Sequence, residues 1–374
     1  MRVALIVIVT LAALLGGLYG VGYFLLPNTL QVSSSVTIER PRATVYALVS
    51  HVSLVREWSP YWQRDPEAEY FFSGEDGQVG QTLRWRSTKN SVGNGSLSVL
   101  EMVPGERVSG RLELDNRARL ETAFLVEAGE TGAVATWQVS GNCDPGLVNI
   151  LCRYANLVLA PAIKNDLDDG LEELKRLAED LPNVDFGGIE LDVVSIPPRR
   201  YIFDDIQVSA DTARSNPEQF AEALRNAEQS VLGFFAEYQL SPDSPSRVVV
   251  TTQDDGEYFK FRVGQFYSGP TPLVLTGVET GETPAGRMAR VVYRGPRAGM
   301  PQAYEQVDAY LQTRRIERRG DGLPWEVYAT QPVPMAATPV SDTPGAASTG
   351  ADTATITAPP VEATVQVEIF IPVE

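Results

Sequence analysis

The chain has 374 residues, enough for two domains of ordinary size, and 43% of them are hydrophobic. Its 31 Lys and Arg against 48 Asp and Glu give a net charge of −17, which would repel a phosphate backbone and argues against nucleic acid as a partner. The single histidine, His51, excludes catalytic triads built on imidazole and multi-histidine metal sites. We therefore expect no metal and no cofactor.

The chain opens with an uncharged apolar segment over residues 3–27. About 20 apolar residues suffice to cross the hydrocarbon core of a bilayer, so the segment predicts a transmembrane anchor. The alternative is a cleaved signal peptide, whose apolar region is usually shorter. Arg2 on one side and Arg40 and Arg42 on the other do not fix the orientation. The lysine-free, Ala/Thr/Pro-rich tail favours soluble domains outside the cytoplasm.

The next region, residues 30–181, predicts a short helix followed by a run of antiparallel strands. A strand pattern precedes Pro41, which opens a helix, and five strand candidates separated by turn residues follow. Leucines and isoleucines at three- and four-residue spacing then predict one long amphipathic helix over residues 159–180.

This order resembles the SRPBCC or START-like superfamily, in its polyketide-cyclase-like branch. The resemblance rests on "ERPRATVYALVSHVSLVREWSPYW" (39–62), "GQVGQTLRW" (77–85) and the closing helix. It implies a helix-grip fold, in which a curved sheet grips the last helix and encloses an apolar pocket. Trp58, Trp62, Trp85 and Trp137 are candidates for that pocket or for an ordinary core. His51 is expected to be a surface or capping residue.

Cys143 and Cys152 are nine residues apart. In an oxidising compartment they could close a short loop by a disulfide, and otherwise they would be two reduced core cysteines. The sequence leaves both readings open. Two cysteines and a distant histidine do not suit a zinc site.

Beyond a Pro- and Gly-containing linker at 182–188, an arrangement of strand, helix and two strands occurs twice. The first copy has strands at 199–208, 246–253 and 257–266 around a helix at 217–238. The second has strands at 285–295, 325–332 and 364–374 around a helix at 301–316. Residues 334–363, rich in Pro, Ala, Ser and Thr, predict a disordered insertion before the last strand.

The duplicated unit, residues 189–374, resembles the GyrI-like effector-binding domain, which also occurs in bacterial transcription regulators. The resemblance rests on "TPAGRMARVVYRGP" (283–296), "WEVY" (325–328) and "EIFIPV" (368–373). It implies a groove between the two repeats that binds small molecules. The predicted fold class is thus α+β: an N-terminal transmembrane helix, a START-like domain and a duplicated GyrI-like domain.

The resemblance also implies the candidate ligand-binding residues. Glu326 matches the position of an acid that receives cationic amphipathic molecules among aromatic rings. Alternation along a strand puts Tyr328 on the same face as Glu326, and Trp325 on the opposite face. The further candidates are Tyr293, Tyr201 and Phe203, and the alternative for Glu326 is a solvated strand face.

These features predict a binding protein for small amphipathic or hydrophobic ligands, anchored once in a bacterial inner membrane. Two other functions stay open: a hydrolase or cyclase that uses Glu326 as its acid, and a signalling or assembly module whose grooves hold a peptide. The sequence does not indicate the ligand or the oligomeric state.

Overall fold

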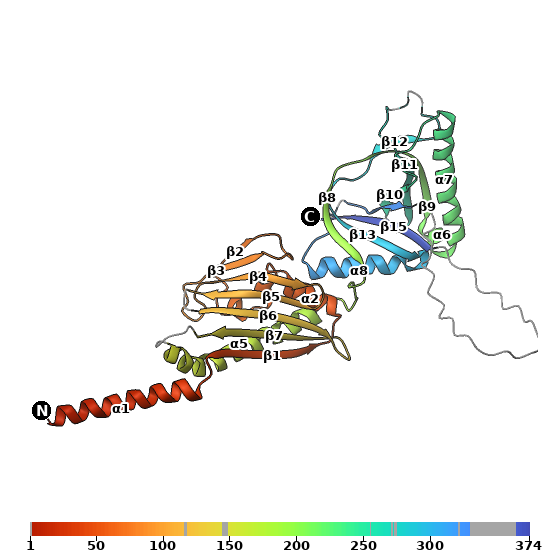
Figure 1. The fold of residues 1–374 in the computed structure, drawn as a ribbon. Coiled ribbons are helices and arrows are strands. Elements are labelled where there is room, and N and C mark those ends of the chain that lie inside the picture. Colours follow the sequence, from red (N-terminus) through yellow and green to blue (C-terminus); the bar gives the residue numbers. More distant parts are fainter. Residues whose placement is uncertain are drawn as a thin grey trace, which may run out of the picture. The chain divides into compact units, whose positions relative to one another are not determined.

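A computed structural model describes residues 2–115, 118–143, 149–254, 256–270, 272, 275–320, 322–329 and 364–374 (Figure 1). The chain divides into two compact units. Unit 1 comprises Met1–Gly187 with Gln312–Arg314, and unit 2 comprises Gly188–Leu311 with Arg315–Glu374. The division at residue 187 falls in the segment predicted as a linker, and the predicted insertion at 334–363 lies outside the described residues.

Unit 1 begins with helix α1, Arg2–Leu25. Its residues Leu5–Leu25 have a mean hydropathy of 2.3, and they are long and apolar enough to cross a membrane, a test that a signal sequence also passes. A candidate span is therefore present where the sequence predicts one.

The rest of unit 1 is a seven-stranded antiparallel sheet with helices packed on one face, in the strand order β1-β7-β6-β5-β4-β3-β2. Its strands are β1 Thr29–Ile38, β2 Glu69–Ser73, β3 Thr82–Arg86, β4 Gly95–Val103, β5 Arg107–Leu114, β6 Ala118–Ala128 and β7 Ala133–Asn142. Its helices are α2 Arg42–Ser50, α3 Val55–Trp58, α4 Pro60–Arg64 and α5 Asn149–Glu179. This is a mixed α+β architecture of the helix-grip kind, as predicted.

The core of unit 1 lies between this sheet and helix α5. Trp58, Phe124 and Trp137 form a three-ring cluster with centroids 4.7 to 5.6 Å apart. Trp85 is also buried, whereas Trp62 is half-buried and packs edge-on against Tyr70. Three of the four tryptophans named as pocket candidates are thus core residues, each contributing a few kcal/mol by burial.

Helix α5 begins at Asn149, ten residues before the predicted start at residue 159. The prediction was wrong there because Pro161 resembles a first-turn proline, whereas in the structure it lies inside the helix. Most of residues 150–163 are also apolar, with Arg153 and Asn156 as exceptions, so no single apolar stripe marks them as helical.

Unit 2 is built on an eight-stranded sheet in the order β12-β9-β11-β10-β14-β15-β13-β8. Its strands are β8 Glu190–Ile196, β9 Arg200–Ser209, β10 Arg247–Asp254, β11 Tyr258–Phe266, β12 Glu279–Glu282, β13 Gly286–Pro296, β14 Trp325–Tyr328 and β15 Thr364–Pro372. Its helices are α6 Ala210–Ser215, α7 Pro217–Glu237, the 3₁₀ turn η1 Arg297–Gly299 and α8 Met300–Thr313.

Apart from β8, α6, β12 and η1, the elements of unit 2 follow one another as β9, α7, β10, β11 and then as β13, α8, β14, β15. In the sheet, the last strand of each set lies between the other two. The strand predicted at 364–374 is confirmed, because β15 pairs with both β13 and β14. The sequence did not predict β8, which pairs with the outer side of β13.

Helices α7 and α8 pack on the same face of this sheet. On that face Val263 and Ile202 contact α7, while Ala289 and Ile369 belong to the core cluster that includes α8. The alternate residues of the same strands point to the other face and form a separate aromatic cluster. We call the two sides the helix face and the open face.

Candidate ligand-binding site

The centre of the open face is formed by β14 and β15. In their antiparallel register Trp325 is opposite Phe370, and Val327 is opposite Glu368. Because neighbours along a strand point to opposite faces, these four side chains share the open face, and Glu326 and Tyr328 point to the helix face. The alternation predicted for "WEVY" is therefore confirmed by the clusters that these residues join.

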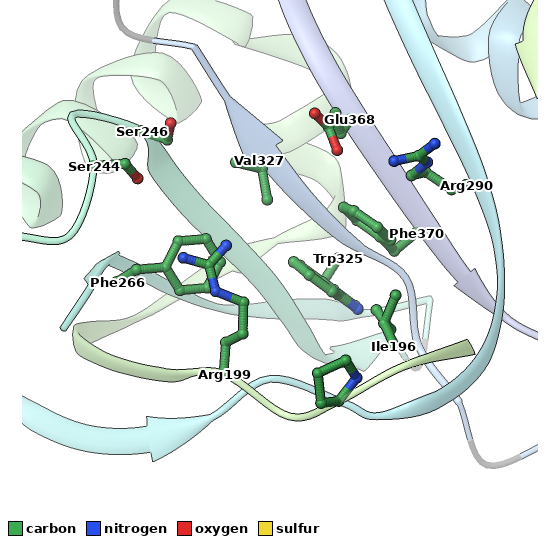
Figure 2. A pocket seen from close by; sticks show the side chains of 11 residues that line it. Ile196, Arg199, Ser244, Ser246, Phe266, Arg290, Trp325, Val327, Glu368 and Phe370 are labelled. Carbon is green, nitrogen blue, oxygen red and sulfur yellow. The ribbon is translucent and has the colours of Figure 1, made fainter. Parts of the chain in front are cut away.

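A cavity of about 320 Å³ lies on the open face (Figure 2). Seven strands, or the residues next to their ends, contribute to its wall: β8, β9, β10, β11, β13, β14 and β15. The lining residues are Ile196, Pro197, Arg199, Ser244, Ser246, Phe266, Arg290, Trp325, Val327, Glu368 and Phe370. The volume is at the small end of the range for sites that hold small organic ligands.

The apolar part of the wall is a stacked pair of rings. Trp325 and Phe370 lie with centroids 4.1 Å apart and an interplanar angle of 9°. The indole Nε1 of Trp325 is buried and has no hydrogen-bond partner among the residues that the structure describes. A ligand could thus meet two flat rings here, with one donor close by.

Three charged residues complete the wall. Glu368 is half-buried in the middle of β15. Arg290 is held by Asp192 of β8, its Nε and Nη2 donating to the two carboxylate oxygens at 3.1 and 2.9 Å. The guanidinium of Arg199 lies 3.5 Å from the centre of the Phe266 ring. In Figure 2, the rings of Trp325 and Phe370 lie in the middle of the wall. Arg290 and Glu368 lie on one side of them, and Arg199 and Phe266 lie on the other.

This arrangement can recognise an amphipathic molecule. Flat rings bind an apolar or cationic body, and a half-buried carboxylate adds Coulomb attraction for a positive group. Arg290 already has a carboxylate partner in Asp192, so it neutralises less of the charge of Glu368 than an unpaired arginine would.

The cavity contains one of the six predicted ligand residues, Trp325. Tyr201 and Phe203 are on the same face, with centroids 5.0 Å apart, but they are core residues beneath it and do not line the cavity. Burial raises the pKa of Tyr201 to about 12. These two residues support the wall from behind.

Glu326 and Tyr328 belong to the helix face. The carboxylate of Glu326 accepts a hydrogen bond from the hydroxyl of Tyr304 on α8 at 2.7 Å, and its other oxygen accepts one from Tyr328. Burial, followed by the charge of Glu326, raises the pKa of both tyrosines. Glu326 thus fastens α8 to β14, on the side of the sheet away from the cavity, and its role in ligand binding stays a prediction.

Tyr293, near the end of β13, also packs on the helix face. Its hydroxyl donates to the carbonyl of Pro296 at 2.6 Å. Its ring lies in the cluster formed with α8. The structure therefore brings Tyr293 near Glu326 and Tyr328 rather than near Trp325, and its role as a ligand residue stays a prediction.

Sequence reasoning missed three cavity residues, Glu368, Arg290 and Arg199. A signal for Glu368 was present, since it is the one charged residue of Thr364–Pro372 and shares a face with Phe370 rather than with the buried aliphatic residues. No group of three potential metal-binding side chains occurs within the described ranges.

The comparisons with known proteins concern mainly the first part of the chain. Residues 29–179 match the family model described as "Polyketide cyclase / dehydrase and lipid transport", so this region is a polyketide-cyclase-like domain of the SRPBCC kind. No curated protein matches the chain. The resemblance of residues 189–374 to GyrI-like domains stays a prediction.

Several solved structures are similar to part of the chain. A protein from Chromobacterium violaceum is 19% identical, with 41% of this chain and 99% of that protein covered and a TM-score of 0.28. A protein from Mesorhizobium loti is 15% identical, with 40% and 97% covered and a TM-score of 0.30. The di-domain ARO/CYC protein StfQ of the steffimycin biosynthetic pathway is 12% identical, with 41% and 51% covered and a TM-score of 0.33.

Proposed function

We propose that the protein binds small amphipathic molecules while anchored to a membrane by α1, and that the open-face cavity of unit 2 is one of its binding sites. The observation that carries this proposal is the position of Glu368, a half-buried carboxylate in a cavity walled by Trp325, Phe370 and Phe266. Partial burial of an acid is unfavourable for an empty site and becomes favourable when a cation neutralises it.

The expected ligand has a flat apolar body and a positive or hydrogen-bond-donating group. The body would lie against the stacked rings of Trp325 and Phe370, and the polar group would approach Glu368. The match of residues 29–179 to a family that includes lipid transport supports a second, hydrophobic ligand in unit 1. Both units would then act on molecules that partition into membranes.

The test compares two isosteric variants, E368Q and E326Q, in titrations with a cationic amphipathic dye and with a neutral analogue of the same ring system. E368Q should weaken dye binding by about 1 to 3 kcal/mol, the range of a charge-assisted contact in a partly desolvated site, and leave the neutral analogue unaffected. E326Q should leave both affinities unchanged, because its carboxylate faces α8.

The reverse result would assign the site to the helix face. If E326Q weakens dye binding and E368Q does not, the acid predicted from the sequence is the ligand residue and the cavity proposal fails. Equal affinity of both variants and the parent protein would exclude a contact of the dye with either carboxylate, and the cavity proposal would fail.

A further inference from the structure

The first half of helix α5 exposes a run of large apolar side chains. Leu151 is 70% exposed, Leu157 55%, Val158 75% and Leu159 47%. No charged residue occurs between Arg153 and Lys164. A helix on the surface of a water-soluble domain normally turns a polar face outward, and a contiguous exposed apolar surface usually marks an interaction site.

The second half of the same helix behaves differently. From Lys164 onward, Leu167, Leu171 and Leu174 are buried against the sheet and charged residues point outward. The two halves of one continuous helix therefore expose different kinds of side chain, apolar in the first half and charged in the second.

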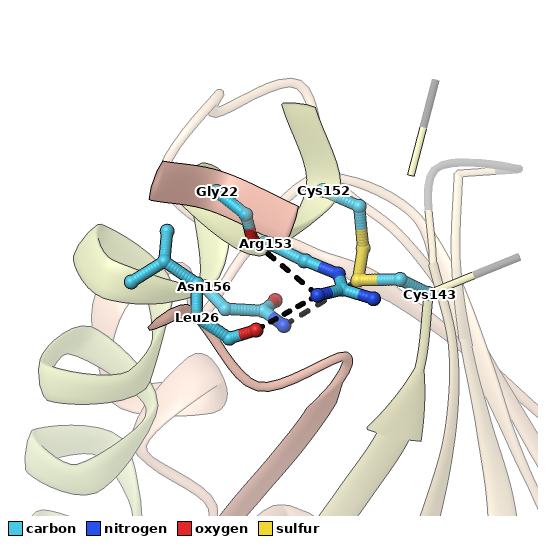
Figure 3. The surroundings of a disulfide bond; sticks show 6 residues. All are labelled: Gly22, Leu26, Cys143, Cys152, Arg153 and Asn156. Atoms are coloured by element: carbon cyan, nitrogen blue, oxygen red, sulfur yellow. Dashed lines mark hydrogen bonds between the residues drawn. A yellow bond between two sulfur atoms is a disulfide. The ribbon is translucent and has the colours of Figure 1, made fainter. Parts of the chain in front are cut away.

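The first half is also fastened to the end of α1 (Figure 3). Arg153 Nη1 donates to three carbonyls at the C-terminal end of α1, those of Gly22 at 3.3 Å, Tyr23 at 2.7 Å and Leu26 at 2.9 Å. The last carbonyls of a helix have no partner within it, and a cation there is favourable. Tyr154 adds a hydrogen bond from its hydroxyl to the carbonyl of Leu18 at 2.8 Å.

The two helices approach closely at this point because Gly22 has no side chain. A Cβ at Gly22 would lie 2.7 Å from the ring of Tyr154 and 3.0 Å from Ile150. A disulfide between Cys152 of α5 and Cys143, which follows β7, ties the start of α5 to the sheet. The sequence left this pairing open. The amide of Cys143 in turn donates to the carbonyl of Asn28, just before β1, at 2.9 Å.

We propose that Leu151, Leu157, Val158 and Leu159, which we call the α5 apolar surface, lie in the lipid bilayer beside the end of α1. Lipid is the occupant because this surface continues directly from the only candidate span in the described part of the chain. The proposal rests on α1 being a retained anchor and needs no ligand in unit 2. The Arg153 contacts support retention, since cleavage after α1 would remove two of the three carbonyls that this guanidinium binds, those of Gly22 and Tyr23.

The test places a tryptophan at an exposed position of α5 in the full chain, reconstituted in phosphatidylcholine vesicles with or without brominated acyl chains. In V158W, the fluorescence added by the new indole should be blue-shifted and quenched at least twofold by bromine. The matched control is L100W, at a 50% exposed position on β4, whose added fluorescence should be unquenched. Both substitutions replace exposed apolar side chains, so folding is little affected.

Three other outcomes would overturn the proposal. Equal quenching of V158W and L100W would show that the α5 apolar surface stays out of the bilayer. A blue shift of V158W that depends on protein concentration and not on bromine would show that a second copy covers the surface. Failure of the parent protein to float with the vesicles would reject the anchor itself, and the dye titrations of unit 2 would be unaffected by any of these results.

Discussion

At the scale of single residues, the most informative side chain is Glu326. A carboxylate between two large aromatics can either bind a ligand or hold neighbouring elements of the fold together. The structure gives both of its oxygens a tyrosine hydroxyl, from Tyr304 and Tyr328. The ring of Tyr328 also lies 4.5 Å below the guanidinium of Arg247, which forms an ion pair with Glu228 of α7 at 3.0 Å. This network connects α7 and α8 to the sheet.

Replacing Tyr304 with Phe tests this network. The half-buried Glu326 would lose one of its two donors, so the free energy of unfolding of unit 2 should fall by about 1 to 2 kcal/mol. The control is Y238F at the C-cap of α7, because Tyr238 is 36% exposed and its hydroxyl should be dispensable. Denaturant unfolding in detergent measures both. A Y304F protein as stable as Y238F would contradict the assignment.

The same tyrosines predict a loss of stability in alkali. Their pKa is raised in the folded protein, so above the ordinary tyrosine pKa of about 10 the unfolded chain releases protons that the folded chain retains. Their stabilising contribution is complete below pH 10 and is lost as the pH rises further. Unit 2 should therefore unfold more easily above pH 10, and Y304F should show a shallower decline.

At the scale of elements, β15 is the strand on which unit 2 depends most. It pairs on one side with β13 and on the other with β14, and Val367, Ile369 and Ile371 are almost fully buried beneath α8. A strand in the middle of a sheet cannot be lost without leaving backbone donors and acceptors on both neighbours unpaired.

Truncation after residue 363 should consequently unfold unit 2 and abolish its thermal transition, while unit 1 keeps its own core. The control removes residues 336–360, whose composition predicts no packed core and whose loss changes loop-closure entropy only slightly. That deletion should shift the melting temperature of unit 2 by a few degrees at most. Similar melting of the two deletions would show that β15 is dispensable.

At the scale of the whole molecule, α1 and the tail composition predict that residues 28–374 lie outside the cytoplasm. A reporter active only in the cytoplasm, fused after Glu374, should be silent, and the same reporter fused before Met1 should be active. This orientation also suits a disulfide between Cys143 and Cys152, which persists in oxidising compartments. A bright C-terminal fusion would reverse the topology.

The sequence predicted those features that depend on local pattern. The strands of unit 1, the division near residue 187 and the strand at the C-terminus follow from periodicity, turn residues and a change in composition. The sequence could not indicate which residues line the cavity, for a physical reason. Alternation on β14 separates Trp325 from Glu326, but both faces carry an aromatic residue, and only tertiary packing decides which face α8 covers.

The start of α5 was missed for a related reason. Its first half is mostly apolar and has exposed as well as buried apolar side chains, so a search for one buried apolar stripe recovers only the second half. Arg290 and Glu368 belong to adjacent strands separated by 78 positions in the sequence, and nothing local indicates that both line one cavity.

The short connection between α1 and β1 limits how far unit 1 can travel. Helix α1 ends at Leu25 and β1 begins at Thr29, so three residues, roughly 10 Å of extended chain, join them. With α1 in a bilayer, unit 1 diffuses in two dimensions within a thin layer at the surface. Unit 1 then meets a molecule dissolved in the same membrane by lateral diffusion. Meeting a molecule dissolved in the surrounding water becomes the slower route.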